Sequence, residues 1–179
     1  MALKIIARGK RVYLREPGPK DRAEFIDKAN RSRNFFYPWI DIKADDAYFE
    51  KYLQKLKDRS KGFLICLYDD HTIAGAININ EIVRGIFQSG YLGYYLFEQY
   101  AGQGYMTEGM RLVIRYAFAE LKLHRLEANI QPANKMSVKL VRSLGFNKEG
   151  LSRRYLKIGG RWRDHQRWAH LKEDWQRQV

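Results

Sequence analysis

The sequence has a single cysteine, Cys66, so no disulfide can form within one chain. It also lacks long hydrophobic runs: the longest is about seven residues, whereas a membrane-spanning helix needs about 20. Basic residues interrupt the segment 1–11, which argues against a secretory signal. We therefore expect a cytoplasmic protein without membrane contact, in which Cys66 is a buried core thiol.

Linkers and internal repeats are also missing. No Pro/Gly/Ser-rich stretch divides the 179 residues, and no segment recurs at a fixed period. A chain of this length can bury a proper core in one piece. The sequence therefore predicts a single domain over 1–179, and it leaves the oligomeric state open between monomer and homodimer.

Metal-binding patterns are absent from the sequence. The histidines have no cysteine partners and no helical i, i+4 spacing; they are His71, His124, His165 and His170. The run 162–165 joins an acid to a base, but neighbouring residues of a strand point to opposite faces. We expect no metal, and we do not expect Asp164 and His165 to face one pocket.

Acidic residues are few beside the basic ones, 20 against 33, which gives a formal net charge of +13. This charge favours polyanionic surroundings, such as ribosomal RNA or an acidic cofactor, without identifying either. Basic residues are densest at 8–11, 148–157 and 161–167. Ribosome or RNA contact through this surface is one interpretation, and an ordinary solvated surface is the other.

The most informative stretch is Gln99-Tyr100-Ala101-Gly102-Gln103-Gly104-Tyr105, which lies between an apolar strand at 91–97 and an amphipathic helix. Apolar residues three and four apart predict that helix over about 105–122. Glycines at a strand-to-helix turn let backbone N–H groups approach a phosphate, and the positive end of the helix dipole points at it. The pattern predicts pyrophosphate binding.

The glycine spacing excludes two familiar phosphate-binding loops. A P-loop needs a Gly-Lys-Ser/Thr end that does not occur here, and the dinucleotide fingerprint needs a third glycine where Thr107 stands. The remaining pattern, Gln-x-x-Gly-x-Gly over 99–104, resembles the acyl-CoA signature of the GNAT acetyltransferase superfamily. Asn134-x-x-Ser137, before a helix that ends at Gly145-Phe146, is similar to the family's next block. The segment 145–165 resembles the branch of RimJ/RimL-type ribosomal-protein-alanine N-acetyltransferases.

The resemblance implies an α+β fold with a mixed, mostly antiparallel sheet of about seven strands and about four helices. In this family the fourth and fifth strands splay apart, and the pantetheine arm of the cofactor lies between them. A loop is expected over 81–88. The residue patterns predict strands near 11–15, 63–68, 72–80, 91–97, 125–130, 152–158 and 161–171, and helices near 19–30, 45–59, 105–122 and 134–144.

The resemblance also implies acetyl-CoA as the co-substrate. Backbone groups of the fourth strand would bind the pantetheine arm, and the glycine turn with the first helical turn would surround the pyrophosphate. Asn134 would reach the pantetheine, and Ser137 would lie near the thioester sulfur. The residues assigned to the cofactor in this way are Tyr94, Tyr95, Leu96, Gln99, Gly102, Gln103, Gly104, Tyr105, Met106, Thr107, Asn134 and Ser137.

The catalytic groups are less distinct. Many family members place a tyrosine, as general acid, four residues before the glycine of Gly-Phe, but this chain has Val141 there. Ser137 is then the candidate donor to the leaving thiolate, with an ordinary serine in a first helical turn as the alternative. The candidate bases are carboxylates that the sequence does not distinguish: Glu81 and Glu149, and also Glu98 and Asp164. Glu149 could equally pair with an arginine.

An aromatic cluster at 35–39 supplies the candidate acceptor residues Phe36, Tyr37 and Trp39. They wall the acceptor site, as the corresponding loop does in the family, or they cap the core. The predicted activity is acetyl transfer to the N-terminal α-amine of a protein, with alanine of a ribosomal protein as the expected acceptor. The alternatives are acetylation of a small amine, such as a polyamine or an amino-sugar, and a non-enzymatic module associated with the ribosome or RNA.

Overall fold

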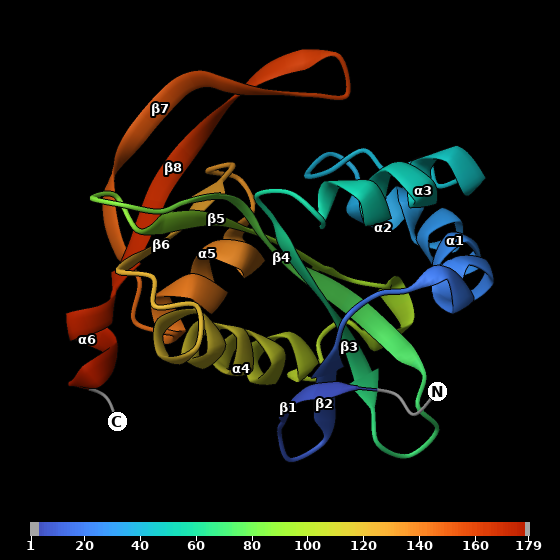
Figure 1. Ribbon diagram of the computed structural model, residues 1–179. Helices are drawn as coiled ribbons and strands as arrows, with labels where there is room; N and C mark the ends of the chain where they lie inside the picture. The colour runs from blue at the N-terminus through green and yellow to red at the C-terminus, as the bar shows by residue number, and fades with distance from the viewer. Residues whose placement is uncertain (1–3, 178–179) are drawn as a thin grey trace.

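The computed structural model describes residues 4–177 and contains one eight-stranded sheet (Figure 1). The strands are β1 (Ile5–Arg8), β2 (Val12–Arg15), β3 (Lys61–Leu67), β4 (Ile73–Val83), β5 (Ser89–Leu96), β6 (Arg125–Ile130), β7 (Asn147–Ile158) and β8 (Arg161–Leu171). The helices are η1 (Pro19–Asp21), α1 (Arg22–Arg31), α2 (Arg33–Phe36), α3 (Asp46–Lys55), η2 (Glu98–Tyr100), α4 (Tyr105–Ala119), α5 (Lys135–Ser143) and α6 (Lys172–Gln176).

The sheet is mixed and mostly antiparallel, with the order β1-β2-β3-β4-β5-β6-β8-β7. Within the described residues, β5 and β6 form its parallel pair, and the other neighbours pair antiparallel. Helix α4 makes the crossover between the two parallel strands, as such a connection requires. The predicted α+β class is confirmed.

Helices cover both faces of the sheet (Figure 1). Helices α4 and α5 bury one apolar cluster, which contains Met110, Val113 and Phe118, whereas α1 and α3 bury a second around Phe25 and Phe49. Burial of each such side chain contributes about 1.5–3 kcal/mol. The periodicity that predicted α4 is therefore its core-facing stripe. No helix within 4–177 combines the length and the apolar character needed to cross a membrane.

Several element boundaries differ from the prediction. Strand β1 adds one strand to the expected seven, and α2 forms inside the aromatic cluster. Strand β4 continues to Val83, so Glu81 lies in a strand rather than in a loop. A register shift between Asn80 and Val83 accommodates Glu81, whose φ is 48°. Such a bulge interrupts the alternation of side chains that makes a strand visible in a sequence.

Strands β7 and β8 form a long hairpin whose tip rises beyond the rest of the sheet at the top of Figure 1. The tip turns at Gly159 and Gly160, both with positive φ. A Cβ atom at Gly159 would lie 3.7 Å from Cε2 of Tyr37, so the tip reaches the aromatic cluster. The hairpin thereby spans the face that carries α1–α3.

Candidate active site

The sheet opens between β5 and β6. Their pairing begins at Ser89 and Arg125 and ends at Leu92 and Ala128, although β5 continues to Leu96. Beyond Leu92, β5 stays paired with β4 on its other edge. Backbone groups of Tyr94–Leu96 that face β6 therefore have no ladder partner there, and an extended ligand arm with amide groups fits this opening.

The glycine turn leads directly into α4. Gly102 and Gly104 have φ values of 74° and 83°, a left-handed conformation that glycine adopts without strain. The first helical bond runs from Glu108 N–H to the carbonyl of Gly104, and no side chain within 4–177 caps the helix N-terminus. The preceding N–H groups are therefore free to bind an anion, with the helix dipole aligned behind them.

Arg11 lies beside this turn, and the sequence pattern did not predict it. Its Nη1 donates to the carbonyl of Gln103 at 2.9 Å, and its guanidinium lies 4.8 Å from the ring centroid of Tyr105. The carboxylate of Glu108 accepts from the backbone N–H of Arg11 at 2.7 Å, which holds β2 against α4. Since Arg11 precedes the turn by some 90 residues, only the fold brings this cation to it.

The side chains of Tyr94 and Ser137 meet at the opening. The Tyr94 hydroxyl lies 2.7 Å from Ser137 Oγ, which links β5 to the first turn of α5. Asn134 caps α5, since its Oδ1 accepts from the backbone N–H of Ser137 at 3.1 Å. Burial raises the pKa of Tyr94 to about 12, so Tyr94 is neutral at physiological pH.

Val141, which stands where many family members have a tyrosine, is part of the core. It is completely buried in the cluster under α4 and α5, and its side chain has no proton to give. Ser137, one helical turn earlier, is partly exposed. Ser137 is therefore the hydroxyl that α5 presents at the opening.

The two carboxylates chosen as candidate bases lie away from the opening. Arg125, the first residue of β6, donates from Nη1 to Oε1 of Glu149 at 2.9 Å, and from Nη2 to the other oxygen. This hydrogen-bonded ion pair lowers the pKa of Glu149, so its carboxylate is a weak base. Glu81 is exposed and lies four residues further along β4 than Ile77, the partner of Tyr94.

Asp164 and His165 point to opposite sides of β8, as the strand argument predicted. The Asp164 carboxylate is exposed and accepts from the backbone N–H of Arg154 at 2.7 Å. His165 is buried, and its Nδ1 lies 2.9 Å from the carbonyl of Arg163, so Nδ1 carries the hydrogen. Burial lowers the pKa of His165, which keeps the imidazole neutral.

The aromatic cluster divides between the core and the surface. Phe36 is buried, with its ring centroid 5.2 Å from that of Tyr95. Tyr37 is 62% exposed and Trp39 is half-buried. Gln131, the residue after β6, donates from Nε2 to the carbonyls of Pro38 and Trp39 at 3.1 and 3.2 Å. The loop after α2 is thus tied to the end of β6 where the sheet opens.

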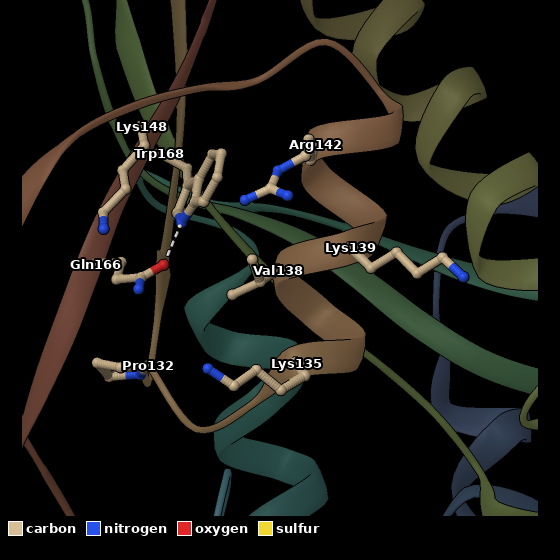
Figure 2. A pocket seen from close by; sticks show the side chains of 8 residues that line it. All are labelled: Pro132, Lys135, Val138, Lys139, Arg142, Lys148, Gln166 and Trp168. Carbon is tan, nitrogen blue, oxygen red and sulfur yellow. Dashed lines mark hydrogen bonds between the residues drawn. The ribbon is translucent and has the colours of Figure 1, made fainter.

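A cavity of about 500 Å³ lies between α5 and the β7–β8 hairpin (Figure 2). Lys135 and Arg142 extend from α5 toward the strands, whereas Lys139 points the other way (Figure 2). The Arg142 guanidinium lies 5.7 Å from the ring centroid of Trp168. The lining residues are Pro132, Lys135, Val138, Lys139, Arg142, Lys148, Gln166 and Trp168, a set with several cations and no carboxylate.

Histidine, cysteine and carboxylate side chains do not gather into any group of three or more suited to a metal ion within 4–177. An opening between two parallel strands, beside a glycine-led helix with an uncapped N-terminus, is the arrangement expected of an acyl-CoA-binding acyltransferase domain. The chain belongs to the GNAT acetyltransferase family, because the model described as "Acetyltransferase (GNAT) domain" matches residues 11–147.

Individual relatives refine this assignment. The chain is 38% identical to the probable N-acetyltransferase YjcK of Bacillus subtilis, over 93% of this chain and 97% of the relative. It is 32% identical to the ribosomal protein uS5-alanine N-acetyltransferase of Escherichia coli, over 92% and 90%. Among solved structures, Mycobacterium smegmatis RimJ in complex with CoA-disulfide superposes with a TM-score of 0.84 at 27% identity, covering 96% of this chain and 86% of that one. This chain is therefore an N-acetyltransferase.

Proposed function

We propose that the protein transfers the acetyl group of acetyl-CoA to the N-terminal α-amine of a protein, with alanine of a ribosomal protein as the favoured acceptor. The observation that carries the proposal is the opening between β5 and β6 beside the uncapped N-terminus of α4. The proposed class of acceptor, a protein N-terminus, rests on the near full-length similarity to the uS5-alanine N-acetyltransferase. Such an acceptor would put the reaction in the cytoplasm.

The opening and the turn fit the parts of the CoA molecule. The free N–H groups of the turn from Gly102 to Thr107 would bind the pyrophosphate, and the unpaired backbone edge of Tyr94–Leu96 would bind the pantetheine amides. The side chain of Gln103 donates to the carbonyl of Gln99 at 3.0 Å, which braces the turn. Arg11 would add a positive charge beside the pyrophosphate.

Direct transfer needs few groups from the protein. Acetyl-CoA supplies the acetyl group as an activated thioester. A backbone N–H on the free edge of β5 would stabilise the negative charge that develops on the carbonyl oxygen when the amine attacks. The Ser137 hydroxyl would donate a hydrogen bond to the sulfur as the C–S bond breaks, and the sulfur finally takes the proton that the amine releases.

The position of Glu81 and Glu149 away from the opening is consistent with an α-amine acceptor. An α-amino group has a pKa of about 7.7–8.0 and is partly neutral at pH 7, whereas a lysine amine at about 10.4 is almost wholly protonated. An N-terminal substrate therefore places less demand on a base. Glu149 is already engaged by Arg125, and we assign it no role in proton transfer.

The acceptor would enter on the face spanned by the β7–β8 hairpin. Tyr37 and Trp39 lie between the hairpin tip and the end of β6, where an N-terminal peptide could contact them. Phe36 would not contact the acceptor directly. It is buried against Tyr95 and would support the loop that carries Tyr37 and Trp39.

The test is incubation of the purified protein with acetyl-CoA and a mixed panel of acceptors, followed by mass spectrometry. The panel contains Ala-, Ser- and Met-starting peptides, polyamines and amino-sugars. Acetylation confined to peptide α-amines, fastest on the Ala peptide, is the expected result. Turnover on small amines alone would replace the acceptor assignment, and acetyl-CoA binding without any product would favour a non-enzymatic module.

We also propose that the basic hairpin contacts RNA when the acceptor is on the ribosome. None of its basic side chains forms an ion pair with a carboxylate within the described chain, and the α5 cavity adds further cations beside it. Unpaired cations release counterions on binding a polyanion, so affinity should fall steeply with salt. The basic residues of the hairpin are Lys148, Arg153, Arg154, Lys157, Arg161, Arg163 and Arg167.

Fluorescence anisotropy with a labelled single-stranded RNA, at several salt concentrations, tests this interaction. Replacing Arg153, Lys157 and Arg161 together by Gln should lower the slope of log affinity against log salt by about 0.7 for each phosphate that the variant no longer neutralises. The matched control replaces three exposed lysines that are not part of the hairpin: Lys4 before β1, Lys51 in α3 and Lys57 after α3. An unchanged slope in the hairpin variant would contradict the proposal.

A further inference from the structure

The side chain of Tyr94 has a contact that its backbone role does not explain. Its hydroxyl lies 2.7 Å from Ser137 Oγ, while the Asn134 cap separately fixes the backbone of Ser137 at 3.1 Å. Ser137 is therefore held by two hydrogen bonds, one with the Tyr94 side chain of β5 and one with the Asn134 cap of α5. A serine that only began a helix would need the cap alone.

The packing of the Tyr94 ring bears on the direction of the hydrogen bond. Each hydroxyl has one hydrogen to donate. The Tyr94 ring packs against the apolar cluster of α4 and α5, and Ser137 is the hydrogen-bond partner of its hydroxyl within 4–177. If Ser137 donated, the phenolic hydrogen would need an acceptor of its own, and the side chains that pack on the ring are apolar. We take Tyr94 as the donor, and the Ser137 hydrogen then stays available for a second acceptor.

Tyr94 keeps its own proton throughout the reaction. Burial raises its pKa to about 12, well above the value of about 8.5 for an ordinary thiol. Transfer of the phenolic proton to a departing thiolate would therefore run uphill. The hydroxyl is suited to orient Ser137 and to withdraw electron density from its oxygen, which makes the serine hydrogen a better donor.

We propose that Tyr94 is a positioning residue, which fixes the Ser137 hydroxyl with its hydrogen turned toward the sulfur of the bound thioester. The inference rests on the proposed function, because that function puts the sulfur beside Ser137. When the C–S bond breaks, the electron pair stays on sulfur and the serine hydrogen bond stabilises it. Neither hydroxyl loses its proton, and the thiolate takes the proton released by the amine.

Kinetics of four variants test the arrangement: Tyr94→Phe, Ser137→Ala, the double variant, and Tyr116→Phe as the matched control. The Tyr116 ring packs on Phe63 in the same core, with centroids 5.3 Å apart. Tyr94→Phe should lower kcat about tenfold, as expected for one hydrogen bond in the transition state, with KM for acetyl-CoA changed less than twofold. Tyr116→Phe should leave kcat unchanged.

The double variant separates positioning from a merely structural role. If Tyr94 acts through Ser137, the double variant should be no slower than Ser137→Ala alone. A kcat reduced by the product of the two single effects would overturn the proposal, as would a Tyr94→Phe enzyme as fast as the control. Thermal unfolding of every variant shows whether a loss of rate reflects a loss of fold.

Two features separate this proposal from the acceptor assignment. The kinetics use whichever amine the wild-type protein acetylates, so turnover on a polyamine would refute the N-terminal acceptor and still test Tyr94. Crystal structures with CoA need no turnover: Ser137 Oγ should lie within hydrogen-bond distance of the sulfur in the wild type and should rotate away in Tyr94→Phe. The same Ser137 rotamer in both proteins would overturn the proposal.

Discussion

The side-chain amide of Gln131 donates to the carbonyl of Trp39 at 3.2 Å, and this bond joins the end of β6 to the loop after α2. The same amide reaches the carbonyl of Pro38 at 3.1 Å. These residues are some 90 positions apart in the chain. One side chain thus fixes the candidate acceptor loop at the point where the sheet opens.

Replacement of Gln131 by Ala should loosen that loop. We expect KM for the acceptor to rise about fivefold, the effect of losing roughly 1 kcal/mol of hydrogen bonding, while KM for acetyl-CoA stays the same. Steady-state kinetics with each substrate varied in turn measure both constants. Gln54→Ala, on the exposed side of α3, is the control. A rise in KM for acetyl-CoA alone would refute an acceptor role for the loop.

Replacement of Gly104 by Ala should weaken acetyl-CoA binding at least tenfold. A Cβ at this position would lie 3.0 Å from Arg11 Nη2, and the φ of 83° costs a side chain about 1–2 kcal/mol. Isothermal titration calorimetry measures the affinity. Gly85→Ala is a matched control, because its φ is 71° and the space around it is open. Equal affinities of the two variants would show that the turn does not bind the cofactor.

Arg11→Ala should raise the Kd for acetyl-CoA about fivefold at low salt, and less at high salt, because salt screens the attraction between the guanidinium and the pyrophosphate. Arg8→Ala, on the exposed end of β1, is the comparison. Calorimetry at two ionic strengths gives both values. If Arg11→Ala binds like Arg8→Ala at low salt, Arg11 only links β2 to α4 through Glu108.

The ion pair of Glu149 with Arg125 should make stability depend on pH. A carboxyl whose pKa is lowered by folding stabilises the fold above its unfolded pKa of 4.5, and this contribution is lost as the pH falls through the folded value. Since the Glu149 side chain is 39% exposed, solvent screening limits the effect to about 0.5 kcal/mol.

Urea unfolding at pH 7 and at pH 3 tests this sign. Glu149→Gln should be less stable than the wild type at pH 7 and close to it at pH 3, where the wild-type carboxyl is protonated. Glu120→Gln, on an exposed position at the end of α4, should show no such dependence. A larger loss at pH 3 than at pH 7 would contradict the assigned cause.

Local patterns predicted those parts of the fold that face a continuous core. Helix α4 has apolar residues on one stripe because it packs on the sheet, and β6 matches the predicted residues 125–130 because it is an inner, largely buried strand of that sheet. Strand β7 was only partly predicted: its residues from Asn147 to Leu151 are mostly exposed and carry no apolar alternation. Strand β1 was not predicted: its residues are partly buried or exposed and show no alternation, whereas β2, of the same length, is buried throughout.

Some features of the candidate site could likewise be predicted from local sequence, and others arise only from the fold. The glycine turn was readable because backbone conformation there depends on glycine itself. The pairing of Tyr94 with Ser137 joins residues 43 positions apart, and nothing in either local pattern specifies the other. Glu149 illustrates the reverse case. As a carboxylate it was a candidate base, and only the fold shows that it is paired with Arg125.

The most direct test of the central claim uses one Ala-starting peptide that also contains an internal lysine. After incubation with acetyl-CoA, tandem mass spectrometry locates the acetyl group, with Gly104→Ala as the cofactor-site control. The account predicts a single acetyl group on the α-amine of the alanine, formed much more slowly by the variant. Acetylation of the lysine side chain instead, or equal rates in both proteins, would contradict it.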